Sequence, residues 1–110
     1  MSPLRLKGHK YGAQRTEVDG LTFDSQAEAR QYQRLCLLLK AGAIQDLVVH
    51  PDWPLDVNGV RVARYIGDFA YTDTATGQRV VMDVKGVRTP TYRLKKKLMK
   101  ALYAIDILET

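Results

Sequence analysis

The pairing of two predicted strands, residues 65–73 and 78–85, constrains the fold of this chain more than any other feature. The residues between them, 74–77, have the sequence "TATG" and are typical of a short turn. If this turn closes tightly, the antiparallel register of the two strands follows from it by counting along the ladder. The predicted pairs are Asp73 with Gln78, Tyr71 with Val80, Phe69 with Met82, and Asp68 with Asp83.

This register places Asp68 and Asp83 opposite each other on one face of the sheet. Lys85 shares that face, because side chains alternate along a strand. Opposed residues have Cβ atoms roughly 4.5 to 5.5 Å apart, and like charges at such positions destabilise a sheet. A divalent cation would offset the repulsion, and carboxylate oxygens are ligands that Mg²⁺ takes. The pattern therefore predicts a magnesium site, in which Lys85 orients the attacking water and stabilises charge.

The clearest predicted helix precedes these strands, in "DSQAEARQYQRLCLLLKAGA" at residues 24–43. Ser25 can cap this helix, Glu28 completes a capping box, and Gly42 is placed to end it. Glu28 lies four residues before Tyr32 on the apolar stripe, so it is expected to point toward the packed side. Glu28 is both a candidate third carboxylate and a candidate cap, and both roles stay open.

The remaining elements predict an α/β (α+β) protein. A hairpin is expected around Asp19 and Gly20, and a second turn at Asn58 and Gly59 joins two further strands. Another helix is predicted from about residue 90 to 104, and a last short strand in "IDILE" closes the chain. The apolar residues at helical spacing in this second helix are Leu94, Leu98, Ala101 and Leu102.

The charge of the chain suits a polyanionic partner. Seventeen Lys and Arg against twelve Asp and Glu give a formal net charge of +5. Residues 1–15 are expected to form a flexible basic arm, and residues 16–110 a single domain. The single cysteine excludes an internal disulfide. No apolar run approaches the ~20 residues that cross a bilayer, and no secretory signal is recognisable, so we expect a cytoplasmic protein without a membrane partner.

The stretch "GDFAYTDTATGQRVVMDVKG" resembles the motif of the PD-(D/E)XK nuclease superfamily, an aspartate at the end of one strand followed by Asp-x-Lys on the next. With "FDSQAEARQYQRL" before it and "TPTYRLKKKL" after it, the pattern is similar to a family of small phage and prophage proteins in that superfamily. Some relatives are Holliday-junction resolvases of the endonuclease I type. The resemblance covers residues 17–108. Gly67 departs from the motif, which has proline at that position.

The resemblance implies a restriction-endonuclease-like core, with a mixed central β-sheet flanked by helices. It implies that Asp68, Asp83 and Glu28 hold Mg²⁺, for which Mn²⁺ substitutes, together with the carbonyl oxygen of Val84. It also implies that Lys85 is the catalytic lysine. No small-molecule cofactor is expected.

The basic segments supply candidate contacts to DNA. Lys96 is the first choice for a phosphate contact, because residues 95–97 cannot all share one narrow stripe of a helix. The solvated face of an amphipathic helix is the alternative interpretation of this charge run. The candidate DNA-binding residues are Lys10, Arg15, Thr89, Tyr92, Arg93, Lys95 and Lys96.

The sequence thus predicts a Mg²⁺-dependent endonuclease that hydrolyses DNA phosphodiester bonds and is selective for DNA structure rather than base sequence. A branched substrate such as a Holliday junction is expected, in phage or prophage DNA recombination or processing within a bacterial host cell. Two symmetric cuts would require a homodimer. Two alternatives stay open: a non-catalytic DNA-binding module with the same fold, in which Asp83 and Lys85 form a structural ion pair, and a phage assembly protein.

Overall fold

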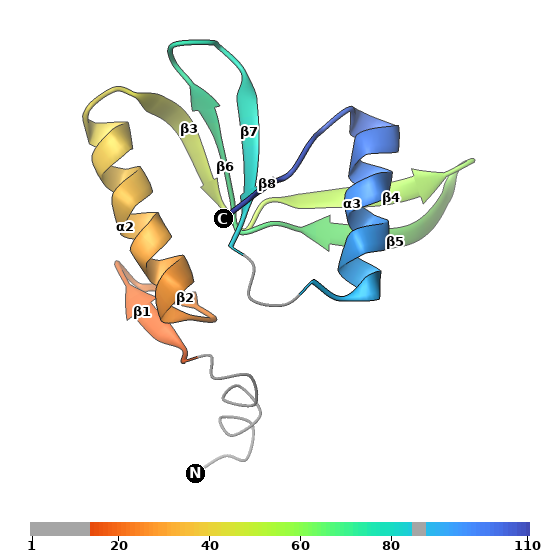
Figure 1. Ribbon diagram of the computed structural model, residues 1–110, viewed down its shortest axis with the longest axis horizontal. Coiled ribbons are helices and arrows are strands. Elements are labelled where there is room, and N and C mark those ends of the chain that lie inside the picture. Colours follow the sequence, from red (N-terminus) through yellow and green to blue (C-terminus); the bar gives the residue numbers. More distant parts are fainter. Residues whose placement is uncertain (1–13, 85–87) are drawn as a thin grey trace. The chain divides into compact units, whose positions relative to one another are not determined.

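The computed structural model describes residues 14–84 and 88–110, in which two helices and eight strands form a mixed α and β protein (Figure 1). The chain divides into two compact units, Met1–Leu37 and Leu38–Thr110, so the single domain predicted over residues 16–110 spans both. Residues 1–13 of the predicted basic arm, which include Lys10, lie outside the described residues. Neither helix in the described parts of the chain is long and apolar enough to span a membrane.

The first unit contains a hairpin, β1 (Thr16–Val18) and β2 (Leu21–Phe23), and most of helix α2 (Gln26–Lys40). The predicted turn is confirmed: Asp19 and Gly20 have φ values of 54° and 77°, as a two-residue turn of this kind needs. The predicted cap is confirmed as well, because the Ser25 hydroxyl accepts the backbone N–H of Glu28 at 3.1 Å. Glu28 is only 5% exposed, which agrees with its expected orientation.

The second unit is built on a four-stranded sheet in the order β3 (Ile44–Val49), β6 (Phe69–Asp73), β7 (Arg79–Asp83), β8 (Leu108–Glu109). The β7–β8 pair is parallel and the other pairs are antiparallel. Helix α3 (Pro90–Tyr103) lies in the connection between β7 and β8, as a parallel pair requires a crossover. Strands β4 (Asp52–Val57) and β5 (Val60–Ile66) form a separate antiparallel ribbon that lies against α3 (Figure 1).

The predicted register of β6 and β7 is confirmed. Tyr71 pairs with Val80 and Phe69 with Met82, and the N–H of Asp73 donates to the carbonyl oxygen of Gln78 at 2.9 Å. The regular ladder ends at the pair of Phe69 with Met82. The predicted pair of Asp68 with Asp83 is not part of this ladder. The N–H of Asp68 donates to the carbonyl oxygen of Met82 at 3.2 Å, and Asp83 follows Met82 as the last residue of β7.

The continuous strand predicted over residues 65–73 is wrong, because the chain changes partners at Gly67 and Asp68. Gly67 still bonds to the β4 side, through its N–H and the carbonyl oxygen of Pro51 at 2.9 Å. Asp68 already bonds to the sheet, through its N–H and the carbonyl oxygen of Met82 at 3.2 Å. One segment thus supplies β5 to the ribbon and β6 to the sheet.

Helix α3 begins where the sequence predicts, but its buried face differs from the prediction. Tyr92 and Met99 are buried. Of the predicted apolar residues, Leu98 packs against the core, whereas Leu94 is 57% exposed. The buried pair lies two turns apart and packs with the ribbon and the sheet, since one core cluster joins all three elements. Its buried members are Leu55, Tyr65, Ala70, Val81, Tyr92, Met99 and Ile107.

The C-terminal cap of α3 can be tested by substitution. Ala104 caps the helix in the left-handed conformation, with φ of 57°. Because glycine adopts this conformation without a steric penalty, Ala104→Gly should raise the free energy of unfolding by about 1 kcal/mol and the melting temperature by about 4 °C. Ala101→Gly, at an exposed position inside the same helix, should lower stability by about 1 kcal/mol. Thermal unfolding measures both, and a destabilised Ala104→Gly protein would contradict the cap.

Candidate functional site

Asp83 is a buried carboxylate at the end of β7, with 3% of its surface exposed. Its Oδ2 atom accepts a hydrogen bond of 2.5 Å from the hydroxyl of Tyr65 on β5. A charged group in such surroundings needs polar partners to offset its lost hydration. Burial raises the pKa of Tyr65, and the hydrogen bond to Asp83 raises it further. Tyr65 therefore stays protonated and remains a donor to the carboxylate.

Asp68 lies just beyond the last regular pair of β6 and β7. Its Oδ2 atom accepts the backbone N–H of Val84 at 2.6 Å, so the side chain replaces a ladder bond. The charge of Asp68 also contributes to the raised pKa of Tyr65, after burial and Asp83. The two predicted aspartates therefore lie at the same end of the hairpin and both act on one hydroxyl group, although each has its own hydrogen-bond partner.

His50 is a neighbour of Asp68 that the sequence does not predict. It follows β3 with φ of 55° and donates its backbone N–H to the carbonyl oxygen of Asp68 at 3.0 Å. A ring nitrogen of His50 and a carboxylate oxygen of Asp68 lie within 4.8 Å of each other. The sequence gives no signal for this approach, because it depends on the pairing of β3 with β6.

Asp83 opens on a pocket of about 250 Å³ in the second unit. Tyr65 and Tyr92 contribute to its wall, and Lys95 and Arg64 contribute positive charge. Arg64 is paired with Asp52 at 3.0 Å, whereas Lys95 has no ion pair among the described residues. The pocket thus combines a buried carboxylate with a lysine whose charge is available to an anion.

Two predicted DNA-binding residues have structural bonds beside this pocket. The hydroxyl of Thr89 accepts the backbone N–H of Tyr92 at 3.1 Å and caps α3. The hydroxyl of Tyr92 donates to Oε2 of Glu109 on β8 at 2.6 Å. Tyr92 also lines a second pocket, so the same residue contributes to both cavities.

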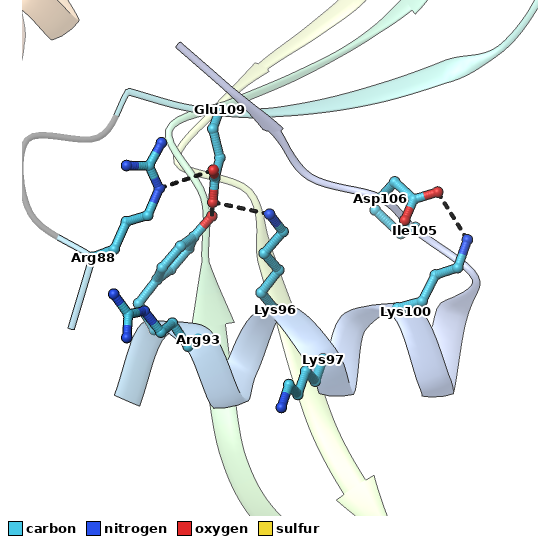
Figure 2. Close-up of a pocket in the computed structure, with 9 residues that line it drawn as sticks. Arg88, Arg93, Lys96, Lys97, Lys100, Ile105, Asp106 and Glu109 are labelled. Atoms are coloured by element: carbon cyan, nitrogen blue, oxygen red, sulfur yellow. Dashed lines mark hydrogen bonds and ion pairs between the residues drawn. The ribbon is translucent and has the colours of Figure 1, made fainter. Parts of the chain in front are cut away.

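The second pocket has a volume of about 490 Å³ and surrounds Glu109 with cations (Figure 2). Glu109 accepts bonds from Lys96 at 3.1 Å and from Arg88 at 2.9 Å, besides the bond from Tyr92. These donors, Tyr92 first and Lys96 next, lower the pKa of Glu109 to about 2. Lys96, the first choice for a phosphate contact, is thus neutralised within the protein, whereas Arg93 lines the same pocket without an ion pair among the described residues.

The other predicted site residues lie outside the described residues, belong to the first unit, or adjoin Asp68 in the second unit. Lys85 lies outside the described residues, as does Lys10. Glu28 and Arg15 belong to the first unit, where Arg15 is exposed. Val84 is part-buried and is held to Asp68 through its N–H.

Comparison with known families found a match over most of the chain. A family model described as "Protein of unknown function (DUF1064)" matches residues 8–108. Comparison with curated proteins and with solved structures found no match.

The bond between Tyr65 and Asp83 predicts a loss of stability in Tyr65→Phe. Without the hydroxyl the buried carboxylate loses a donor, so the free energy of unfolding should fall by about 1–3 kcal/mol. Tyr103→Phe is the control, because the Tyr103 hydroxyl donates to the carbonyl oxygen of Pro54 at an exposed position and should contribute less. Urea unfolding measures both variants. Equal losses in the two would show that burial of Asp83 adds nothing to its bond.

The lowered pKa of Glu109 predicts a pH-dependent contribution to stability. The contribution is complete above the ordinary pKa of 4.5 and is lost as the pH falls toward the folded-state value of about 2. The Glu109→Gln variant cannot titrate, so its deficit in unfolding free energy relative to the unmodified protein should shrink over this range. Urea unfolding at several pH values measures the deficit. A deficit that stays constant with pH would contradict the assignment.

Proposed function

The chain belongs to the DUF1064 family of proteins of unknown function, and for this member we propose a metal-dependent endonuclease activity on DNA. The observation that carries the proposal is the buried carboxylate of Asp83, which faces a pocket containing Lys95 and lies at the same end of the β6–β7 hairpin as Asp68. Carboxylates beside a cation suit a site that holds a divalent metal ion and a phosphate group.

The residues present fit a magnesium or manganese ion. Asp68 and Asp83 supply the oxygen atoms that these ions prefer. Each carboxylate has about four lone-pair sites, so the bonds to Tyr65 and Val84 are compatible with a metal ligand role. When bound, the ion would stabilise the negative charge that develops on the phosphate during hydrolysis.

The protein's own groups have distinct roles in this proposal. Tyr65 holds one oxygen of Asp83 in place, and the N–H of Val84 does the same for Asp68. Lys95 offsets the charge of a phosphate in the pocket. Glu28 and the carbonyl oxygen of Val84 are proposed as further ligands, and Lys85 as the lysine that orients water, on the strength of the motif "MDVKG" and the preceding helix.

The proposal extends to the type of core, the DNA substrate, the oligomeric state and the cellular setting. A mixed sheet in which Asp68 directly precedes β6 and Asp83 ends β7 supports a restriction-endonuclease-like core. We propose branched DNA, such as a four-way junction, as the substrate, and a homodimer as the form that makes two cuts. The proposed setting is phage or prophage DNA processing in the bacterial cytoplasm.

A non-catalytic DNA-binding module is the second candidate. The hydrogen bond from Tyr65 favours it, because this bond gives Asp83 a structural role that needs no metal ion. The two candidates differ in whether the carboxylates are needed for cleavage or only for the fold.

Replacement of the aspartates separates the two candidates. Asp83→Asn and Asp68→Asn keep an oxygen acceptor for Tyr65 and Val84 but remove the negative charge. Cleavage should therefore fall by roughly a hundredfold or more, the scale at which single electrostatic groups act in active sites, while DNA affinity in EDTA is retained. Asp73→Asn is the matched control, since Asp73 lies at the other end of the same hairpin and accepts the N–H of Ala75.

The assay uses linear, single-stranded, flapped and four-way DNA with Mg²⁺ or Mn²⁺, and EDTA as the metal-free control. Full cleavage by Asp83→Asn would exclude the proposed site. Binding without cleavage by the unmodified protein on every substrate would favour the DNA-binding module.

A further inference from the structure

The pocket around Glu109 carries an excess of positive charge. Five cations and two acids line it, which leaves three positive charges. The pocket lies between α3 and the last residues of the chain (Figure 2). The cations are Arg88, Arg93, Lys96, Lys97 and Lys100, and the acids are Asp106 and Glu109.

Four of the cations occupy one face of α3, because their spacing is three, four and seven residues. Arg93 lies one turn before Lys97, and Lys96 lies one turn before Lys100. Like charges at this spacing destabilise a helix. The arrangement therefore costs stability unless negative charge is supplied to it.

The protein supplies that charge to only half of the face. Glu109 pairs with Lys96 at 3.1 Å, and Asp106 pairs with Lys100 at 2.8 Å (Figure 2). Arg93 and Lys97 form no ion pair with any residue in the described parts of the chain. Two cations, one helical turn apart, thus line the pocket without a counter-charge of their own.

We propose that Arg93 and Lys97 bind the backbone phosphates of a nucleic-acid strand in this pocket, next to the phosphate that is cleaved. The proposal rests on the proposed function, because it assigns the second pocket to the same substrate. Arginine and lysine are the side chains that contact phosphate most often, and arginine does so with two parallel donors.

The position of Tyr92 supports a shared substrate. Tyr92 lines both the Asp83 pocket and the Glu109 pocket, so the two cavities adjoin. A strand whose phosphate lies near Lys95 in the first pocket has neighbouring phosphates within reach of the second. Glu109 has a different role: it holds Tyr92, Arg88 and Lys96 in place and offsets part of the positive charge of Arg88 and Lys96.

The salt dependence of binding distinguishes this assignment from a general effect of charge. Log affinity falls linearly as log salt concentration rises, and each phosphate contact to duplex DNA adds about 0.9 to the magnitude of this negative slope. The double variant Arg93→Gln, Lys97→Gln should therefore reduce the magnitude of the slope by about 1.8. Lys96→Gln should leave the slope nearly unchanged, because Lys96 is already paired with Glu109.

The measurement is fluorescence anisotropy of a short labelled duplex with the full chain in EDTA, over a series of KCl concentrations. The control with the same change in net charge is Arg34→Gln, Lys40→Gln on α2, which does not line the pocket. An equal loss of slope in this control would overturn the proposal, as would an unchanged slope in the Arg93, Lys97 variant. Equal competition by polyglutamate and by unlabelled duplex would also overturn it, since the pocket would then accept any polyanion.

The binding and cleavage experiments test the phosphate pocket and the nuclease activity separately. Because EDTA prevents metal-dependent cleavage, a lost slope in the Arg93, Lys97 variant supports the phosphate pocket even if no substrate is cut. Cleavage that depends on Asp83, together with an unchanged slope in that variant, would sustain the nuclease and exclude the pocket.

Discussion

The hydrogen bond from the Tyr65 hydroxyl to Asp83 joins the β4–β5 ribbon to the end of the central sheet. Tyr65 belongs at the same time to the core cluster that contains Tyr92 and Met99 of α3. A buried carboxylate is costly without polar partners, so its position fixes the ribbon, the sheet and the helix relative to one another. The candidate site is therefore located where the three elements of the second unit meet.

Local signals in the sequence account for the parts of the fold that were predicted correctly. The turn at Asp19 and Gly20, the Ser25 cap and the register from Phe69 to Asp73 each depend on residues close together in the chain. The break at Gly67 could not be predicted, because it arises when one segment changes from pairing with β4 to pairing with the sheet. That choice is made by tertiary contacts, which a strand pattern does not encode.

The same distinction applies to the site and to α3. The register identifies Asp68 and Asp83, but the partners Tyr65 on β5 and His50 just after β3 belong to parts of the chain whose placement is not local. In α3 the leucine spacing identified Leu98, which packs against the core, but missed the two buried residues, Tyr92 and Met99. Large side chains with polar ends, Tyr92 above all, can bury an apolar ring while the hydroxyl bonds to a charged partner, so counting aliphatic residues alone misses them.

Glycine at position 67 follows from the tyrosine that holds Asp83. A Cβ atom on Gly67 would lie 3.2 Å from the hydroxyl oxygen of Tyr65 and 3.3 Å from a ring carbon, closer than such atoms usually approach. Tyr65 is buried and hydrogen-bonded, so its ring has little room to move. Proline would add this crowding and remove the N–H that bonds to Pro51. Glycine at this position thus leaves space for the ring that positions the carboxylate.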